Sequence, residues 1–169
     1  MAKTARRPVI ESVDAHINDK AVRLICDYAH AMDDGNIDQW PEFFTEAALY
    51  HVTTRENHDA DLPIGIIRCK GRGMMVDRVK AFHTANIFEP HTYNHMVGPS
   101  VIMPGSSPEA VACRSNFQIV RIMEDGRMDL FATGKYVDKI VAVNGACKFA
   151  ERIVVCDGGN IDALLAMPL

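Results

Sequence analysis

The chain has 169 residues, of which 48% are hydrophobic and 24% charged, and its formal net charge is −4. This composition excludes a disordered chain and is typical of a globular domain with a sizeable core. The acidic balance leaves no basic surplus to neutralise a phosphate backbone, so we expect no nucleic acid partner.

The hydropathy of the chain argues against membranes and secretion. The longest apolar runs, such as Ile64–Ile67 and Ile140–Val143, are far too short to span a bilayer. The basic stretch Met1–Arg7 is not followed by the apolar run of a secretory signal. The five cysteines contain no C-x-x-C pair, which favours reduced thiols over a disulfide frame or a zinc site. We therefore predict a cytoplasmic protein without a membrane partner.

The first half of the chain is predicted to be mainly helical. Apolar residues recur at three- and four-residue spacing from Ser12 to Met32, which predicts a long helix, and Gly35 suits its C-cap. A shorter helix around Trp40 is expected next. A strand over Ala48–Thr53 and a third helix over Met74–Thr84 complete this half.

The second half alternates with period two, which predicts β-strands. Asp125-Gly126 and Asn144-Gly145 are strong signals for tight hairpin turns, so the long strands should form an antiparallel meander. The predicted strands cover Tyr93–Met103, Val111–Met123, Asp129–Val143 and Cys147–Cys156.

Helices first and a meander last predict an α+β fold. Long antiparallel strands twist and coil, so the sheet should wrap around the N-terminal helices as a cone with an open mouth. Such a mouth can hold a ligand, or side chains can fill it. Residues 1–10 are expected to be a flexible segment ahead of a single domain of residues 11–169.

The densest polar cluster runs from Glu89 to His95 and raises the question of a metal site. His91 and His95 with the Glu89 carboxylate would suit non-haem iron. In a strand, however, the two histidines lie about 13 Å apart, too far to share one metal ion. No cysteine has a histidine two or three residues away, so the sequence lacks the Cys-His pairs of a Rieske centre. We expect neither a metal nor another cofactor in this chain.

A pocket for acid–base chemistry is the best enzymatic alternative. Tyr28 and the Asp33-Asp34 pair lie on or just after the first helix, and His95 lies at the start of a strand. If they converge at the mouth of the cone, Tyr28, Asp34 and His95 would suit proton abstraction next to a carbonyl, or a dehydration. Without catalysis, Tyr28 would pack in the core and the paired acids would cap or solvate the helix end.

One face of the first long strand is polar. It carries Arg114, Asn116 and Gln118, while Cys113 and Phe117 belong to the opposite face. A polar sheet face is either plain solvent surface or an interface, where arginine and asparagine supply directional contacts. The convex side of the sheet is usually free in a cone fold, so a second subunit has room to bind there.

Several motifs, taken in their order and spacing, resemble the β subunits of Rieske-type aromatic-ring-hydroxylating oxygenases. The resemblance runs from residue 20 to residue 169. From Asp38 to Ile87 the chain is most similar to small subunits that act with aromatic carboxylates, those of terephthalate dioxygenase and salicylate hydroxylase. The motifs are Asp34-Gly35 with Trp40 and Phe43-Phe44-Thr45, Thr54-Arg55-Glu56-Asn57, Arg114-Ser115-Asn116-Phe117 with Arg121, Phe131 to Asp138, and Glu151-Arg152-Ile153-Val154.

The resemblance implies an NTF2-like cone and an α3β3 hexamer in which the β subunits form a trimeric base. It implies that the Rieske [2Fe–2S] cluster, the mononuclear iron and the substrate belong to the α subunit. This chain would then be a non-catalytic, structural partner in aromatic compound catabolism, with Arg114, Asn116 and Arg121 as candidates for subunit contacts. Two alternatives stay open: a stand-alone dehydratase, isomerase or cyclase using the Tyr-Asp-His pocket, and a binding module for a small apolar ligand.

Overall fold

A computed structural model describes residues 12–84, 89–104, 106–107, 109–159, 165 and 167–169. The predicted flexible segment 1–10 lies outside these residues. Among the described residues, no helix is long and apolar enough to cross a membrane.

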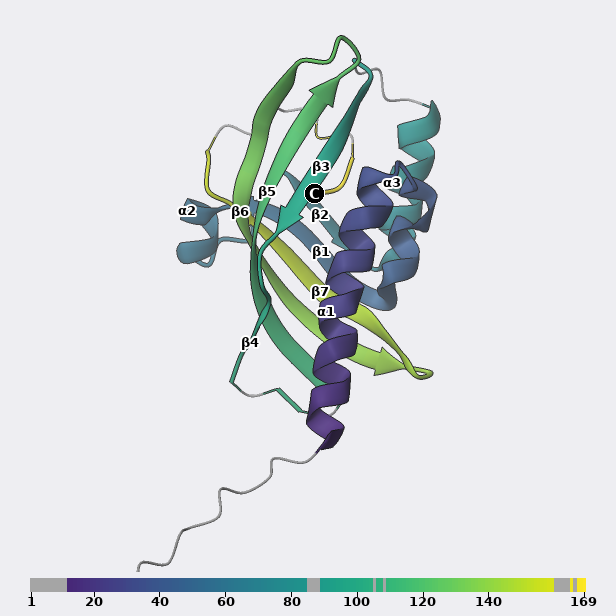
Figure 1. Ribbon diagram of the computed structural model, residues 1–169, viewed down its shortest axis with the longest axis vertical. Coiled ribbons are helices and arrows are strands. Elements are labelled where there is room, and N and C mark those ends of the chain that lie inside the picture. The colour runs from purple at the N-terminus through teal and green to yellow at the C-terminus, as the bar shows by residue number, and fades with distance from the viewer. Residues whose placement is uncertain (1–11, 85–88, 105, 108, 160–164, 166) are drawn as a thin grey trace, which may run out of the picture.

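The described chain combines helices with one large curved sheet (Figure 1). The helical elements are α1 (Ser12–Asp33), the 3-10 helix η1 (Ile37–Phe43), α2 (Arg55–Asp59) and α3 (Arg72–Thr84). The strands are β1 (Phe44–Thr54), β2 (Ile67–Lys70), β3 (His91–Val97), β4 (Val101–Ile102), β5 (Ala110–Met123), β6 (Met128–Val143) and β7 (Ala146–Cys156).

The sheet has the strand order β2-β1-β7-β6-β5-β3, and β4 pairs with β5 beside this path. The meander β5-β6-β7 is antiparallel, which confirms the sequence prediction. In contrast to an all-antiparallel sheet, β1 and β7 pair in parallel. Parallel neighbours need a long connection, and here the rest of the sheet lies between them in the sequence.

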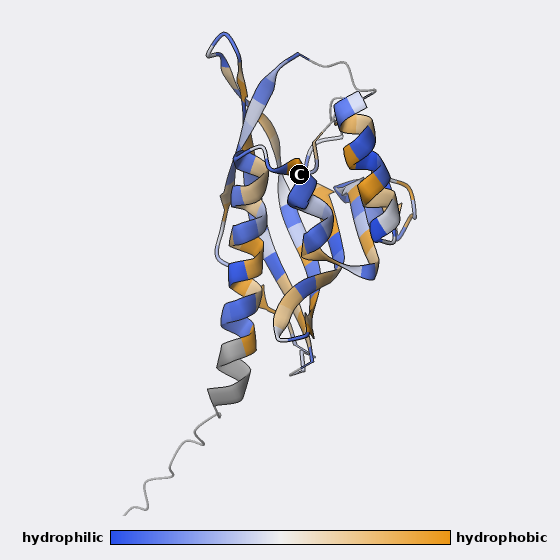
Figure 2. Cartoon of the chain, turned by 90° about the vertical axis from the view of Figure 1, so that its right-hand side faces the viewer, coloured by the Kyte–Doolittle hydropathy of each residue, from blue (hydrophilic) through white to orange (hydrophobic). Residues whose placement is uncertain are grey.

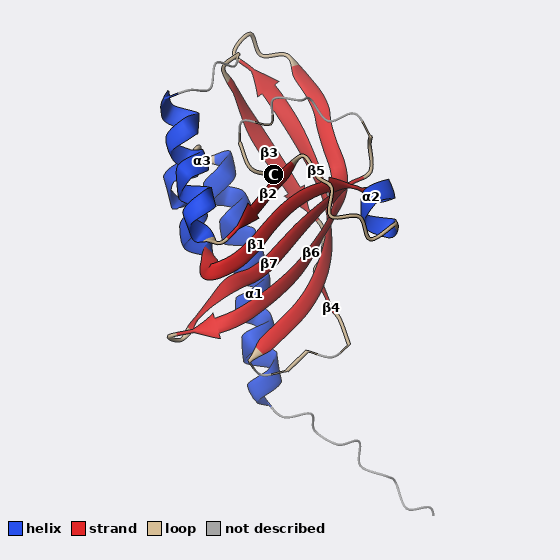
Figure 3. Ribbon diagram, turned by 180° about the vertical axis from the view of Figure 1, so that it is seen from behind, coloured by secondary structure: helices blue, strands red, loops and turns tan. Residues whose placement is uncertain are grey.

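Helices α1 and α3 cover the concave side of the sheet, whereas the short α2 lies on the other side (Figures 1 and 3). Figure 2 shows the alternation of hydrophobic and hydrophilic residues along α1 and α3. The side chains of Leu24, Ile25 and Tyr28 on α1 are buried in the core, as the helical spacing predicts. Gly35 ends this region in the left-handed conformation, with φ of +72°.

Several predicted boundaries shift in the structure. The segment around Trp40 is a 3-10 helix with Pro41 in its interior, and β1 begins at Phe44, four residues before the predicted strand start at Ala48. The predicted strand Tyr93–Met103 is divided into β3 and β4. The intervening Gly98 and Pro99 weaken strand pairing, which explains the division.

The two predicted hairpin turns are present. Gly126 has φ of +84°, and Asn144 and Gly145 have φ of 51° and 82°. Two successive residues with positive φ are typical of the turn that best matches the twist of a β-hairpin. The turns therefore set the register of β5, β6 and β7 next to each hairpin, and a shift in each strand pair, near Ile119 and near Lys139, changes it by one residue further along.

Candidate functional site

The concave side of the sheet is filled by the chain itself near its C-terminal end. Leu165, Met167 and Leu169 are buried against the core. The hydroxyls of Tyr28 and Tyr50 donate to the carbonyl oxygen of Leu169 at 2.9 and 3.1 Å, and the Leu169 N–H donates to Tyr50 Oη at 2.9 Å. Of the two options for the cone, the structure shows side chains filling this part of the interior.

Beneath this segment lies an ion pair that is completely enclosed. Arg152 of β7 donates from Nε and Nη2 to the two carboxylate oxygens of Asp138 of β6, each at 2.9 Å. The guanidinium carbon also lies 4.1–4.2 Å from the ring centres of Tyr28, Tyr136 and Phe149. Stacking on three aromatic rings partly offsets the loss of hydration of the cation.

Burial is the largest influence on the pKa values of three tyrosines in this interior. It raises the pKa of Tyr28 to about 12, although the neighbouring Arg152 acts in the opposite direction. Burial also raises the pKa values of Tyr50 and Tyr136 well above the ordinary value for tyrosine. All three phenols therefore stay protonated at neutral pH and act as hydrogen-bond donors or packing groups, not as bases.

The structure does not bring Tyr28, Asp34 and His95 together as one set. Tyr28 is engaged with Leu169, and Asp34 is exposed at the end of α1. Its neighbour Asp33 instead approaches His95, with Oδ1 and Nδ1 2.5 Å apart. The Asp33 carboxylate also accepts the backbone N–H of His95 at 2.9 Å. The pair joins the end of α1 to the middle of β3, which is a structural role.

The histidine-rich stretch before and within β3 forms no metal centre with its neighbours. His91 Nδ1 lies 2.7 Å from the carbonyl oxygen of Glu89, and His95 is held by Asp33. Across the part of the chain that the structure describes, no group of three or more His, Cys, Asp or Glu side chains could hold a metal ion. The described residues thus do not fit either of the iron groups that the resemblance implies.

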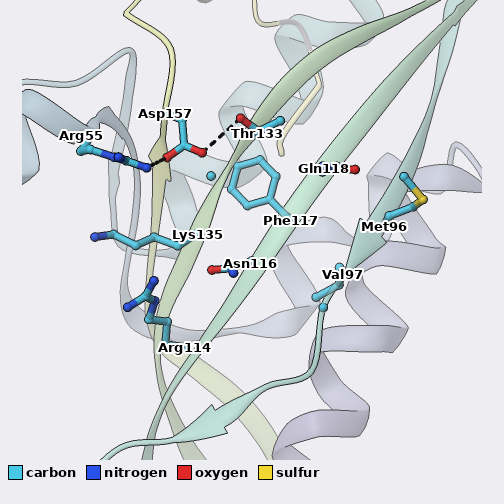
Figure 4. Close-up of a pocket in the computed structure, with 12 residues that line it drawn as sticks. Arg55, Met96, Val97, Arg114, Asn116, Phe117, Gln118, Thr133, Lys135 and Asp157 are labelled. Atoms are coloured by element: carbon cyan, nitrogen blue, oxygen red, sulfur yellow. Dashed lines mark hydrogen bonds and ion pairs between the residues drawn. The ribbon is translucent and has the colours of Figure 1, made fainter.

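The opposite, convex side of the sheet carries a groove with a cavity volume of about 600 Å³ (Figure 4). We call it the outer groove. Its polar and charged side chains come from α2, β5, β6 and the residue after β7, and Met96 of β3 adds an apolar edge. These polar and charged residues are Arg55, Arg114, Asn116, Gln118, Thr133, Lys135 and Asp157.

The outer groove carries more positive than negative charges. Asp157 forms an ion pair with Arg55 and accepts a hydrogen bond from the Thr133 hydroxyl at 3.1 Å. Arg114 and Lys135 make no hydrogen bond or ion pair with another described residue. Three cations and one carboxylate give the groove a local charge of +2, opposite in sign to the chain as a whole.

Two of the three predicted contact residues meet in this groove and the third does not. Arg114 and Asn116 both line it and are exposed. Arg121 lies seven residues beyond Arg114, and an odd separation along a strand turns a side chain to the other face. Its guanidinium pairs with Asp129 at 3.3 Å and lies 5.0 Å from the Phe131 ring centre.

The sequence prediction missed the buried Asp138–Arg152 pair, and local patterns do not predict it. The register set by the Asn144-Gly145 turn, continued along the two strands, would place Asp138 opposite Glu151. A one-residue register shift between β6 and β7 brings Arg152 opposite Asp138 instead. Arg55 of the outer groove was not predicted as a site residue either, because its helix α2 has only five residues.

The fold places the molecule in the class of NTF2-like α+β cones with an unclosed, curved sheet. One solved structure superposes with a TM-score of 0.85 at 30% identity and covers 94% of this chain and 100% of its own. It is described as the beta subunit of an aromatic-ring-hydroxylating dioxygenase from Novosphingobium aromaticivorans.

Residues 28–163 match the family described as ring hydroxylating beta subunit. Subunit beta 2 of the terminal oxygenase component of terephthalate 1,2-dioxygenase from a Comamonas species is 40% identical over 84% of this chain and 92% of its own length. The small subunit of anthranilate 1,2-dioxygenase from Burkholderia cepacia is 33% identical over 84% and 88%. The chain belongs to the family of ring-hydroxylating dioxygenase beta subunits.

Proposed function

We propose that this chain is the non-catalytic, structural β subunit of an aromatic-ring-hydroxylating dioxygenase and assembles with an iron-containing α subunit. The observation that carries the proposal is the filled interior of the cone. There the backbone oxygen of Leu169 accepts hydrogen bonds from the hydroxyls of Tyr28 and Tyr50. A β subunit that stabilises the assembly needs a rigid body with a binding surface, and does not need an open pocket.

The proposal assigns the Rieske [2Fe–2S] cluster and the mononuclear iron to the α subunit, where they supply the redox chemistry of ring hydroxylation. Its support within this chain is the poor fit of the described residues to either group. His91 and His95, the pair closest in sequence, are engaged with Glu89 and Asp33. Under the proposal these histidines hold β3 in place.

We further propose an α3β3 assembly in the cytoplasm with the β subunits as a trimeric base, acting on an aromatic carboxylate. The named substrates of the two curated relatives, terephthalate and anthranilate, are both aromatic carboxylates and support this class. Selection of the substrate would belong to the α subunit, because Leu165, Met167 and Leu169 of this chain fill part of its own interior.

The alternative acid–base enzyme finds less support in the geometry. Tyr28 is protonated and hydrogen bonded to the backbone, and Asp34 is exposed at a helix end. Asp33 and His95 form a pair, and Tyr28 is not part of it because its hydroxyl bonds to Leu169. A binding module for small apolar ligands would need an empty cavity in the part of the interior that Leu165, Met167 and Leu169 fill.

Activity of the reconstituted complex tests whether the chain takes part in the chemistry. The α subunit would be assembled with the wild-type chain, with Tyr28→Phe or with His95→Gln, and product formed from an aromatic carboxylate measured per assembled complex. His91→Gln, on the same strand, is the matched control. We expect all four complexes to agree within about twofold. A loss of about 100-fold or more, as removal of a general acid or base causes, would overturn the proposal.

A further inference from the structure

No described element of the chain covers the outer groove, so its charged side chains are open to a partner. Arg114 and Lys135 extend from neighbouring strands without a counter-charge, and Asp157 is already shared by Arg55 and Thr133. Met96, which pairs with Gln118 at the opposite edge of the groove (Figure 4), is 52% exposed. A partner that matches this groove would bring carboxylates together with some apolar surface.

Carboxylates beside exposed apolar side chains occur elsewhere on the same chain, at the tip of the β5–β6 hairpin. We define the hairpin tip as residues 124–130, which lie at one end of the long axis of the molecule (Figure 1). It contains the acids Glu124, Asp125 and Asp129 against the one cation Arg127, a local charge of −2. Met128 and Leu130 beside the acids are 66% and 63% exposed. Clusters of large exposed apolar residues mark contact surfaces.

We propose that the outer groove of one copy of this chain receives the hairpin tip of a second copy. The inference rests on the proposed function in one respect, the trimeric base of β subunits. The charges of +2 and −2 are complementary, and Met96 meets apolar partners in Met128 and Leu130. Groove and tip are different surfaces, so each copy gives one tip and accepts one. Three such contacts close into the trimeric ring when successive copies are related by a rotation of a third of a turn.

Within the tip, Glu124 is the carboxylate best placed to act between copies. Asp129 is already paired with Arg121 in its own chain, and Asp125 accepts the N–H of Arg127 to shape the turn. Glu124 is exposed and makes no hydrogen bond or ion pair with a described residue. It is also the residue that can be changed without disturbing the turn.

Charge reversal and charge exchange test the contact. The full chain would be purified alone as wild type, as Arg114→Glu/Lys135→Glu, as Glu124→Lys, and as Lys135→Glu/Glu124→Lys. Lys139→Glu is the matched control, because Lys139 is exposed on the same strand four residues further along and does not line the groove. Native mass and sedimentation would measure self-association, circular dichroism would verify the fold, and each variant would also be co-purified with the α subunit.

We expect the wild type and Lys139→Glu to form the same trimer. Arg114→Glu/Lys135→Glu and Glu124→Lys should self-associate at least about tenfold more weakly, and the exchanged pair Lys135→Glu/Glu124→Lys should recover part of the loss. Unchanged self-association in the folded groove variants, or loss of α binding alone, would overturn the inference. Failure of the wild-type chain to bind the α subunit would instead count against the proposed function, because self-association is measured without α.

Discussion

The Asp138–Arg152 pair is the most demanding feature at the scale of single residues, since both side chains are fully buried. Two charges removed from water are tolerated only when they are paired and hydrogen bonded, and the bidentate pair provides two such bonds. The aromatic rings of Tyr28, Tyr136 and Phe149 enclose the guanidinium. The pair therefore joins β6 to β7 under the segment that fills the cone.

Removal of one partner should leave a buried charge uncompensated. We predict that Asp138→Asn lowers the free energy of unfolding by about 3–5 kcal/mol. The same substitution at Asp157, which is partly exposed and pairs with the exposed Arg55, should cost no more than about 1 kcal/mol. Urea unfolding monitored by circular dichroism measures both. Equal losses for the two variants would show that the buried pair has no special role.

The buried tyrosines predict sensitivity to alkali. The pKa of Tyr28 rises from 10.0 to about 12 in the folded chain, so between these pH values the unfolded state ionises while the folded state does not. Stability from this group is thus unchanged below pH 10 and falls as the pH approaches 12, by about 2–3 kcal/mol for a shift of this size.

Urea unfolding at increasing pH, together with the ultraviolet absorbance of tyrosinate, measures this effect. Tyr28→Phe should lose less stability than the wild type over the same pH range, because phenylalanine cannot ionise. Below about pH 12, tyrosinate from Tyr28 should appear only as the protein unfolds. Ionisation of Tyr28 and Tyr50 at such a pH in a chain that is still folded would show that their hydroxyls are not buried and bonded to Leu169.

At the scale of elements, the close approach of β6 and β7 depends on Gly134. A Cβ atom at this position would collide with the carbonyl oxygen of Val155 and would lie 3.0 Å from the Phe117 ring. Backbone atoms of a paired strand cannot move aside as a flexible side chain can. A glycine is therefore required here for packing, although its φ is not positive.

Gly134→Ala should separate β6 from β7 locally and lower the free energy of unfolding by about 1–3 kcal/mol. Gly158→Ala is the control, because a Cβ at that position meets nothing within 4 Å. Thermal unfolding and hydrogen exchange of the β7 amides would detect the difference. A Gly134→Ala chain as stable as the control would mean that the strands are free to shift.

The elements that follow from the sequence are those with strong local signals. The 22-residue α1 has a clear helical period, and the β5-β6-β7 meander has long alternation with two defined turns. The helix α2 and the strand β2 have five and four residues, too few for a period to show. The parallel β1–β7 pair joins residues a hundred positions apart, which no local pattern specifies.

The candidate site was predictable to a similar degree. Period-two alternation correctly groups Arg114 with Asn116, and both line the outer groove. Placement of Arg121 with them rested on the family motif and not on alternation, which is why the structure separates it. Which acid meets His95 depends on the exact angle between α1 and β3, and here it is Asp33.

At the scale of the whole molecule, the two faces of the sheet differ in what their described residues present. The concave side buries Leu169 among tyrosines, whereas the convex side presents a cationic groove on an acidic chain. A molecule built in this way is suited to assembly through its outer surface. Membership of the ring-hydroxylating β subunit family agrees with this division.

Native mass spectrometry of the chain co-expressed with its α subunit, combined with iron analysis of the complex and of the chain alone, would decide whether this chain is a structural subunit without iron. We expect one complex with equal numbers of the two chains, with iron in the complex and none in the isolated chain. A chain that stays separate from the α subunit, or that binds iron by itself, would contradict it.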